Sequence, residues 1–532
     1  MTTISGNQLI GYSQSGNSRE RFSGTVADEA GVPYSFHEAT TAEIDQAIQK
    51  AHLAAASYKR ISYQKRAVFL EKIADEIMAI GPELITVTIQ ESNLPEARLL
   101  GERDRTTGQL RFFAKILREG SWLRAVIDLP STANPAKGDL RQMQIPLGVT
   151  GVWGASNFPF AFSVAGGDTV SALAAGCPVV HKAHPAHPVT CELVGRAIVK
   201  AAQETGMPDG VFSLLHGTSY QTGLQIVRHP LMKAIAFTGS FQGGKALFDE
   251  ANKREEPIPV YSEMGSVNPV FILPGILNEK GTELAKALAA SNLLGVGQFC
   301  TNPGVVVLPN SNGTPTFMAD YKTTIEDASG GVMLTDNIYR SFNKGTEAFA
   351  KHTDVVLMAK GKQIDKKSAA VPQVFTTTAA NFLTNDELAD EVFGPSSIHI
   401  TTKNKEEIFA IARNLKGQLT ATIWGNADDL ENYSELQHIL EDKAGRLIIN
   451  AMPTGVEVNY AMVHGGPFPA TTNGATTSVG AAAIYRFTRP VCFQGFPDNA
   501  LPEPLQNKNS LGILRQIDGK FTTDAIIQLN NE

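Results

Sequence analysis

Short apolar runs alternate with longer amphipathic segments between residues 148 and 273, and this alternation constrains the fold more than any other feature. The runs predicted as strands are 148–153, 178–182, 211–215, 233–237 and 257–261. Strand, helix and strand repeated in this way predict a mostly parallel, doubly wound sheet. Such sheets bind ligands at the carboxyl ends of their strands. Residues at those ends are therefore the first candidates for a functional site.

The flanking regions predict further elements around this sheet. Less regular alternation from residue 262 to 475 predicts a second α/β domain. Residues 41–120 repeat apolar side chains at helical spacing and predict a helical layer. Residues 123–130 and 139–145 alternate on either side of a polar, Pro/Gly-containing loop, which predicts a protruding hairpin. An apolar run at 483–487 predicts one more strand.

Composition and charge exclude several classes of protein. The 532 residues carry 46 Lys+Arg and 53 Asp+Glu, a net charge of −7 without long like-charge runs, so neither nucleic acid nor a membrane surface is an expected partner. Residues 1–8 lack a secretory signal pattern and charge or glycine breaks the apolar runs, which predicts a cytoplasmic protein. The 4 cysteines show neither CxxC spacing nor a Cys/His cluster, so no disulfide framework and no metal site are predicted.

Cys300 is the leading candidate for a nucleophile. It follows a segment at 284–294 that is predicted to be helical, and the glycines and proline around it predict an irregular, exposed loop. A thiolate is the strongest nucleophile that a protein carries near neutral pH, and a carboxylate such as Glu263 can activate the water that cleaves a thioester. Isolated cysteines are more often inert and buried. The pairing of Cys300 with Glu263 is what favours covalent chemistry.

Two of the predicted strands end in sequences suited to a ligand. Asn157 follows the first strand, and its side-chain amide can donate a hydrogen bond to an oxyanion. Gly239, Ser240 and Gly244 follow the fourth strand in a glycine-rich turn that opens a helix, which suits a diphosphate close to backbone N–H groups. No G-x-G-x-x-G motif follows a strand, so the turn is also compatible with a plain β–α connection.

Five motifs together match one known family in order and approximate spacing. They lie at 154–160, 237–240, 263–265, 297–300 and 391–395. The chain therefore resembles the NAD(P)-dependent aldehyde dehydrogenases over nearly its whole length. Longer strings at 154–159, 174–178 and 464–472 resemble the 2,5-dioxovalerate (α-ketoglutarate semialdehyde) dehydrogenase branch, whose relatives include bacterial fatty-aldehyde dehydrogenases.

This resemblance implies a domain organisation for the α/β chain. An aldehyde dehydrogenase-like fold has a doubly wound Rossmann-type cofactor domain, a second α/β catalytic domain and a small oligomerisation hairpin. The expected boundaries are 1–121 and 147–261 for the cofactor domain, 262–475 for the catalytic domain, 122–146 and 476–500 for the oligomerisation elements, and 501–532 for a C-terminal extension. Exposed strand edges tend to pair with another subunit, so a homodimer or homotetramer is expected.

The resemblance also implies a role for each catalytic candidate. Cys300 would attack the aldehyde, and Asn157 together with the Cys300 backbone N–H would hold the oxyanion while hydride leaves for the nicotinamide. Glu263 would then activate the hydrolytic water. Glu391 would hold the nicotinamide ribose, and Phe393 would pack near the ring. Glu263 and Cys300 are 300 − 263 = 37 positions apart, slightly more than the family spacing, which indicates a small insertion.

Cofactor preference depends on the residues around Lys182, which would bond the adenosine ribose. NAD-preferring members of the family usually carry a glutamate three positions after this lysine, and that carboxylate repels a 2′-phosphate. The position is Pro185 in this chain, so the repulsion is absent, and His184 is the neighbouring candidate for contact with the phosphate. We therefore expect NADP, with NAD also possible.

The branch resemblance implies that the substrate is 2,5-dioxovalerate, oxidised to 2-oxoglutarate. A semialdehyde bearing a carboxylate needs a cation in its tunnel. Arg105 and Arg111, on the segment 104–113, are the candidates, and Phe158 and Phe162 are expected to line the entrance. Without an arginine in the tunnel, a fatty aldehyde would be the better substrate.

Two other classes remain open from the residues alone. A nitrilase-like cysteine hydrolase would also combine Cys300, Glu263 and a lysine, but it would leave the turn at Gly239 and the motif at Glu391 without a role. A non-catalytic protein with the same fold would have no reason to combine a thiol, a carboxylate and an amide at one site.

Overall fold

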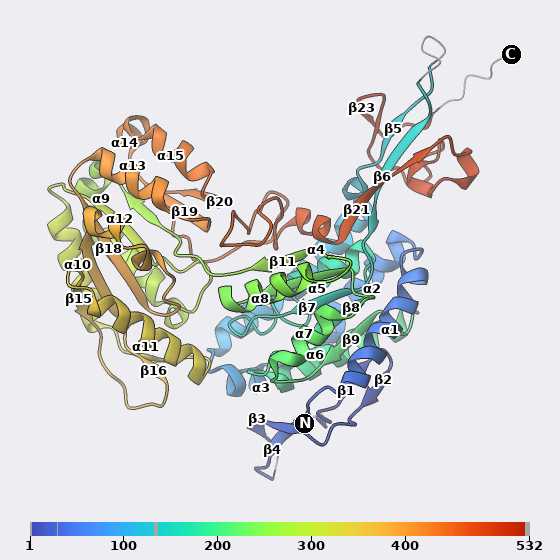
Figure 1. Ribbon diagram of the computed structural model, residues 1–532, viewed down its shortest axis with the longest axis horizontal. Helices are drawn as coiled ribbons and strands as arrows, with labels where there is room; N and C mark the ends of the chain where they lie inside the picture. Colours follow the sequence, from blue (N-terminus) through green and yellow to red (C-terminus); the bar gives the residue numbers. More distant parts are fainter. Residues whose placement is uncertain (1–2, 29, 132–136, 527–532) are drawn as a thin grey trace.

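Three sheets of five or more strands organise the described part of the chain, and their arrangement can be followed in Figure 1. The computed structural model describes residues 3–28, 30–131 and 137–526. Within these residues the strands form two seven-stranded sheets, one five-stranded sheet and two two-stranded sheets. The smallest sheets pair β3 (Arg21–Ala27) with β4 (Pro33–His37) and β14 (Gly331–Val332) with β16 (Ala369–Ala370).

The first seven-stranded sheet contains all five strands predicted between residues 148 and 261. In spatial order it consists of β11 (Val260–Glu263), β10 (Ala234–Thr238), β7 (Thr150–Trp153), β8 (Val179–Lys182), β9 (Phe212–Leu215), β1 (Gln8–Ile10) and β2 (Ser13–Ser15). The first five run parallel, as predicted, and β1 and β2 extend the sheet antiparallel at one edge.

Helices cover both faces of this sheet. They are α1 (Thr41–Tyr58), α2 (Tyr63–Ile80), α3 (Pro82–Ser92), α4 (Glu96–Glu119), α5 (Gly167–Ala175), α6 (Pro188–Glu204), α7 (Tyr220–Arg228) and α8 (Phe241–Asn252). Val179 packs into the core formed with α2–α6, whereas Val180 packs into the core with α1, α7 and α8. Because successive strand residues point to opposite faces, this alternation confirms double winding. The helical layer predicted at 41–120 is α1–α4.

The second seven-stranded sheet repeats the architecture. In spatial order it consists of β15 (Val356–Lys360), β17 (Gln373–Thr378), β18 (Ser396–Thr402), β13 (Val305–Pro309), β12 (Val270–Ile272), β19 (Gln418–Trp424) and β20 (Ala444–Ile449). Its helices are α9 (Pro274–Leu293), α10 (Thr314–Asp327), α11 (Asp336–Lys351), α12 (Ala379–Thr384), α13 (Lys405–Asn414), α14 (Ala427–Asn432) and α15 (Ser434–Glu441). Only the edge pair β15–β17 is antiparallel among the described strands of this sheet. The predicted second α/β fold is confirmed.

The five-stranded sheet projects from the body of the molecule beside the first domain (Figure 1). Its order is β21 (Thr488–Gln494), β6 (Leu140–Pro146), β5 (Val126–Asp128), β22 (Arg515–Ile517) and β23 (Lys520–Thr522). The predicted hairpin corresponds to β5 and β6, which pair antiparallel, and residues 132–136 lie outside the described part. The C-terminal extension contributes β22 and β23, which sequence patterns did not indicate.

The prediction of a strand at 483–487 is wrong. These residues belong to the 3-10 helix η4 (Ala481–Phe487), and the strand β21 begins immediately afterwards. Adjacent residues such as Arg486 and Phe487 are both buried, and Arg486 donates to the Asp168 carboxylate at 2.5 Å. Ala483 N donates to Gly480 O at 3.2 Å, which is the i→i+3 pattern of a 3-10 turn, and a short apolar run does not by itself distinguish a strand from a buried helical turn. The other 3-10 helices are η1 (Ser121–Leu123), η2 (Leu294–Gly297), η3 (Asp386–Ala389), η5 (Asp498–Ala500) and η6 (Glu503–Leu505).

No helix in the described ranges combines the length and apolar character needed to cross a bilayer.

Candidate active site

A sharp turn after α9 places Cys300 on an irregular loop, as predicted. Gly295, Val296 and Gly297 have consecutive positive φ angles of 58°, 59° and 64°. That conformation is unfavourable for a β-branched residue such as valine, and such outliers occur where surrounding contacts fix a functional loop. Asn268 supports the loop, because its Nδ2 donates to the carbonyl oxygens of Cys300 at 2.8 Å and Asn302 at 2.9 Å.

The thiol is less accessible than the sequence predicted, because Cys300 is only partly exposed. Phe299 precedes it and packs edge-to-face against Phe158 at 5.3 Å between ring centroids. The aromatic side chains around the loop therefore exclude much of the solvent.

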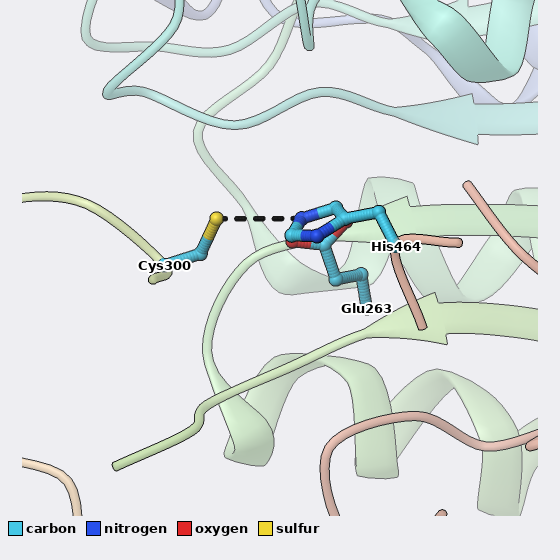
Figure 2. A group of neighbouring side chains, drawn as sticks. All are labelled: Glu263, Cys300 and His464. Atoms are coloured by element: carbon cyan, nitrogen blue, oxygen red, sulfur yellow. Dashed lines mark hydrogen bonds and ion pairs between the residues drawn. The ribbon is translucent and has the colours of Figure 1, made fainter. Parts of the chain in front are cut away.

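Glu263 and His464 face the thiol (Figure 2). His464 Nε2 lies 3.5 Å from Cys300 Sγ and 2.8 Å from Glu263 Oε1. The other carboxylate oxygen of Glu263 accepts the Ser478 hydroxyl at 2.8 Å. Glu263 and His464 are 2% and 1% exposed, so their mutual hydrogen bond is shielded from water.

Backbone pairing brings these two residues together from distant parts of the chain. Glu263 is the last residue of β11, and the segment 464–472 runs beside the end of that strand. Met264 N donates to Ala470 O at 2.8 Å, and Thr472 N donates to Ser262 O at 3.2 Å. The motif at 464–472 thus completes the edge of the first sheet and delivers the imidazole to the carboxylate.

Glu263 and Cys300 have opposite pKa shifts. Burial acts to raise the pKa of Glu263, but the His464 imidazole, the Ser478 hydroxyl and the Cys300 thiol together hold it below its usual value. Burial and the negative charge of Glu263 raise the pKa of the Cys300 thiol well above its usual value. The resting site therefore pairs a neutral thiol with an ionised carboxylate, which is the state that a general base for water requires.

Asn157 lies next to the thiol loop. The residue is 8% exposed, and its Nδ2 donates to the Gln298 carbonyl oxygen at 3.0 Å, two residues before Cys300. An amide nitrogen carries two N–H groups, so one remains for an oxyanion formed at the thiol. The arrangement brings together the three residues that the sequence selected for catalysis, Cys300, Glu263 and Asn157.

The residues predicted to bind the nucleotide lie at the carboxyl ends of strands in the first sheet. Lys182 ends β8, beside the ends of β7 and β9, and its ammonium group donates to the Gly217 carbonyl oxygen. Burial lowers the pKa of Lys182 to about 8. Gly239 follows β10, and Ser240 caps the exposed beginning of α8 by accepting Gly243 N–H at 3.2 Å. Gly244 is buried against the end of β11, where a Cβ would lie 2.7 Å from Met264.

The remaining cofactor candidates occupy two places. Glu391 and Phe393 line a narrow pocket together with Phe299 and Asn302, so they flank the thiol loop. The ring of His184 stacks on His187 with centroids 5.2 Å apart, and the neighbouring Pro185 is exposed.

One of the two candidate arginines faces the site. The Arg105 guanidinium lies 5.1 Å from the centroid of Phe162, whose ring is 6.1 Å from that of His464. Arg105 donates weakly to Val456 O at 3.4 Å, and its Nη1 is buried with no hydrogen-bond partner among the described residues. Phe158 stacks edge-to-face on Phe162 with centroids 5.3 Å apart, which groups both predicted entrance residues.

Arg111 does not belong to this group, which corrects the sequence prediction. Its guanidinium donates to the Asp75 carboxylate at 2.6 Å, and its side chain is 43% exposed. Arg111 lies six residues along α4 from Arg105, and it faces α2 instead of the aromatic cluster of Phe158 and Phe162. An arginine on a helix is often a solvated surface residue, and Arg111 is one.

Sequence reasoning missed several residues of the site. His464 lies in the motif at 464–472, but the sequence indicates no role for it; the glycines that follow it permit the close backbone approach at this point, where a Cβ on Gly466 would lie 2.1 Å from Gln418 O. Arg98 stacks on Phe158 and Phe299 at 4.8 and 4.9 Å and donates to Asn157 O at 2.6 Å. Glu38 accepts Thr218 N–H at 2.9 Å, and its charge acts on Lys182. No local pattern indicated that either residue reaches the site.

Comparison with known proteins agrees with this geometry. The aldehyde dehydrogenase family matches residues 15–490, so the chain belongs to that family. It is 48% identical to alpha-ketoglutaric semialdehyde dehydrogenase 2 of Azospirillum brasilense, over 91% of this chain and 93% of that one. It is 43% identical to an alpha-ketoglutaric semialdehyde dehydrogenase of Acinetobacter baylyi, over 98% of this chain and 100% of the relative.

Solved structures show the same fold at low identity. Aldehyde dehydrogenase C of Pseudomonas syringae, a cysteine-to-alanine mutant in complex with NAD⁺ and octanal, superposes with a TM-score of 0.77 at 19% identity, over 93% of this chain and 98% of that one. The protein is therefore an NAD(P)-dependent oxidoreductase of the aldehyde dehydrogenase family. Family membership decides against the cysteine hydrolase and the non-catalytic alternatives.

Proposed function

We propose that this protein oxidises 2,5-dioxovalerate, which is α-ketoglutaric semialdehyde, to 2-oxoglutarate. The observation that carries the proposal is the match along nearly the whole chain to two alpha-ketoglutaric semialdehyde dehydrogenases, at 48% and 43% identity. The position of Arg105 beside the aromatic cluster supports it, because a semialdehyde with a carboxylate needs a cation at the far end of its tunnel.

In the proposed mechanism Cys300 is the nucleophile. Its thiol ionises, the proton passes to solvent, and Sγ attacks the aldehyde carbon to give a thiohemiacetal. The free N–H of Asn157 and the Cys300 backbone N–H stabilise the oxyanion. NAD(P), when bound, supplies the hydride acceptor, and a thioester on Cys300 remains. Glu263 then takes a proton from water, and the resulting hydroxide releases the acid and restores the thiol.

The described residues fit a dinucleotide. The beginning of α8 is exposed and offers the backbone N–H groups of a glycine-rich turn, which suits a diphosphate. Lys182 would hold the adenosine ribose, with His184 and Pro185 beside it, and Glu391 would hold the nicotinamide ribose. These assignments follow the family motifs and remain proposals.

We propose NADP as the cofactor, with NAD also used. Pro185 brings no carboxylate to the ribose, but Glu38 introduces one beside Lys182 from another part of the chain. We expect Pro185→Glu to reduce kcat/KM for NADP relative to NAD, by like-charge repulsion on the order of 1–3 kcal/mol. Glu38→Gln should act in the opposite direction. If kcat/KM values for both cofactors change together in both variants, this region does not bind the ribose.

The substrate can be tested with a panel of aldehydes followed at the absorbance of reduced nicotinamide. Wild type should prefer 2,5-dioxovalerate over hexanal. Arg105→Met should lower kcat/KM for 2,5-dioxovalerate by about tenfold to a hundredfold, the loss of a charge-assisted hydrogen bond, and should leave hexanal nearly unchanged. Arg111→Met, on the same helix, is the matched control and should change neither. Preference for hexanal in the wild type would instead indicate a fatty-aldehyde dehydrogenase.

We propose that the five-stranded sheet mediates assembly into a homodimer or a dimer of dimers. The outer edge of β21 is free of strand partners within the described part, and Phe496 and Phe521 near this sheet are 46% and 71% exposed. Light scattering should return at least twice the chain mass, and a monomer at micromolar protein would refute the assembly. Location in the cytoplasm stays a prediction.

A further inference from the structure

The three groups that face one another at the thiol also form a metal-ligand set. Glu263, Cys300 and His464 each offer one ligand atom, and these atoms all lie within 4.8 Å of one another. In a tetrahedral zinc site, with metal–ligand distances of about 2.0–2.3 Å, ligand atoms lie about 3.3–3.8 Å apart. Cys300 Sγ and His464 Nε2 are 3.5 Å apart, and His464 Nε2 and Glu263 Oε1 are 2.8 Å apart. The separation of His464 Nε2 and Glu263 Oε1 would widen by about 0.5 Å to admit the ion.

We propose that Zn²⁺ binds reversibly to Glu263, Cys300 and His464 and inhibits the enzyme by capturing its nucleophile. The inhibition rests on the proposed function of Cys300, whereas the binding does not. The ion would be an inhibitor and not a resident cofactor. A cysteine sulfur with an imidazole nitrogen selects zinc over Mg²⁺ or Ca²⁺, which prefer oxygen ligands.

Binding changes protonation but not oxidation state. The S–H bond of Cys300 breaks, a Zn–S bond forms, and one proton leaves to solvent. His464 must present a lone pair on Nε2, so the hydrogen that it shares with Glu263 moves to Nδ1. Glu263 contributes one oxygen while the other keeps the Ser478 hydroxyl at 2.8 Å, which orients the carboxylate. The fourth position of the tetrahedron remains for water.

The surroundings of His464 set the strength of binding. A ligating histidine usually donates its second ring N–H to a carboxylate or carbonyl, and loss of that contact costs about 10–100-fold in metal affinity. Nδ1 of His464 is buried without a hydrogen-bond partner among the described residues. With three protein ligands and this missing support, we expect a dissociation constant on the order of 1 μM at neutral pH, and therefore reversible inhibition.

Titration calorimetry of the full chain, first dialysed against EDTA, tests the site directly. Wild type should bind one Zn²⁺ per chain and release one proton, and Mg²⁺ should not bind. Cys300→Ser and His464→Gln should each weaken Zn²⁺ binding by at least about thirtyfold, because each removes one of the three ligands. Cys492→Ser and His438→Gln, which alter an exposed thiol and an exposed imidazole, should leave it unchanged. Circular dichroism confirms that each variant is folded.

A second readout identifies the sulfur ligand. Co²⁺ in place of Zn²⁺ should add a thiolate-to-metal absorption band in wild type that Cys300→Ser lacks. Aldehyde oxidation should fall as Zn²⁺ is added and recover with EDTA. Absence of binding at roughly 100 μM Zn²⁺, a hundred times the expected dissociation constant, would overturn the site, as would binding lost in the surface variants instead. Binding at Cys300 without loss of turnover would overturn the inhibition alone.

Discussion

Two cysteines in this chain contact a histidine, but only one is placed to act as a nucleophile. Cys300 Sγ lies 3.5 Å from His464 Nε2, and Cys191 Sγ lies 3.2 Å from His187 Nδ1. The shorter distance belongs to the pair at the beginning of α6, where Cys191 is 0% exposed. Burial also raises the pKa of Cys191 to about 12. A thiol beside an imidazole is therefore not sufficient for catalysis, because the substrate must also reach it.

Each of these pairs also has a glutamate nearby, and the two glutamates differ in the groups that their carboxylates bind and in the direction of their pKa shifts. Glu263 accepts hydrogen bonds from two side chains, and its pKa is lowered, so it is available to take a proton. Glu91 accepts Val189 N–H and Thr190 N–H at 2.8 and 2.9 Å, together with the Thr190 hydroxyl. These donors begin α6, and burial raises the pKa of Glu91. Glu91 therefore stabilises the beginning of α6 by accepting hydrogen bonds from N–H groups that have no partner within the helix.

Replacement of Cys300 should reduce activity more than any other substitution. Cys300→Ala should lower aldehyde oxidation by at least about a thousandfold, because no other group replaces the covalent bond to the substrate. Nucleotide affinity should change little, since the thiol bonds the substrate and not the cofactor. Steady-state kinetics and nucleotide titration measure the two quantities.

The matched control is Cys191→Ala, which should retain wild-type turnover. Activity retained by Cys300→Ala, or lost in both variants, would contradict the assignment of the nucleophile.

The next effect concerns Glu263, measured in buffer with EDTA. Glu263→Gln should show one burst of reduced cofactor and then stall, with steady-state kcat lower by about a hundredfold to a thousandfold, because no base activates the hydrolytic water. The negative charge of Glu263 raises the pKa of Cys300, so its removal lowers that pKa. Alkylation of Cys300 by iodoacetamide should therefore begin at lower pH in the variant. Loss of the burst itself would show that Glu263 activates the thiol instead.

His464 is expected to act by positioning Glu263, with a smaller and pH-dependent effect. The imidazole lowers the pKa of Glu263, so His464→Ala should raise it. A carboxyl group with a raised pKa is protonated up to higher pH, and the acidic limb of the kcat profile should move to higher pH, with about tenfold loss below it. His464→Gln keeps an N–H donor and should restore part of the profile. An equal loss at every pH would exclude this role.

The contrast between the two cysteines also shows what sequence patterns can establish. The parallel strands, the glycine turn before α8 and the loop of Cys300 were predictable, because each depends on local periodicity or on residues with special backbone geometry. The glycines and the proline around Cys300 predicted its loop, but they did not by themselves separate a reactive thiol there from the inert thiol of Cys191. The family motifs separated them, and the structure explains the difference through accessibility.

The residues that sequence reasoning missed all depend on long-range contacts. His464 reaches Glu263 across 201 positions, and the C-terminal strand β22 pairs with β5 across 516 − 126 = 390 positions. The same limit explains the errors, because Arg111 and Arg105 differ only in which neighbouring element each one faces. Register against a distant partner is set by packing and leaves no local signature.

Replacement of Cys191 should affect the stability of the protein and leave its activity unchanged. Cys191→Ala removes a buried sulfur that contacts His187, so it should lower the free energy of unfolding by about 1–2 kcal/mol through a small cavity and a lost hydrogen bond. Thermal unfolding should show a modestly lower Tm, while kcat/KM stays within about twofold, because a change of this size leaves the folded population almost unchanged. In the native wild type, alkylation followed by peptide mapping should modify Cys300 and the exposed Cys492 but not Cys191. A native Cys191 that reacted as fast as Cys300 would mean that accessibility is not what separates the two sites.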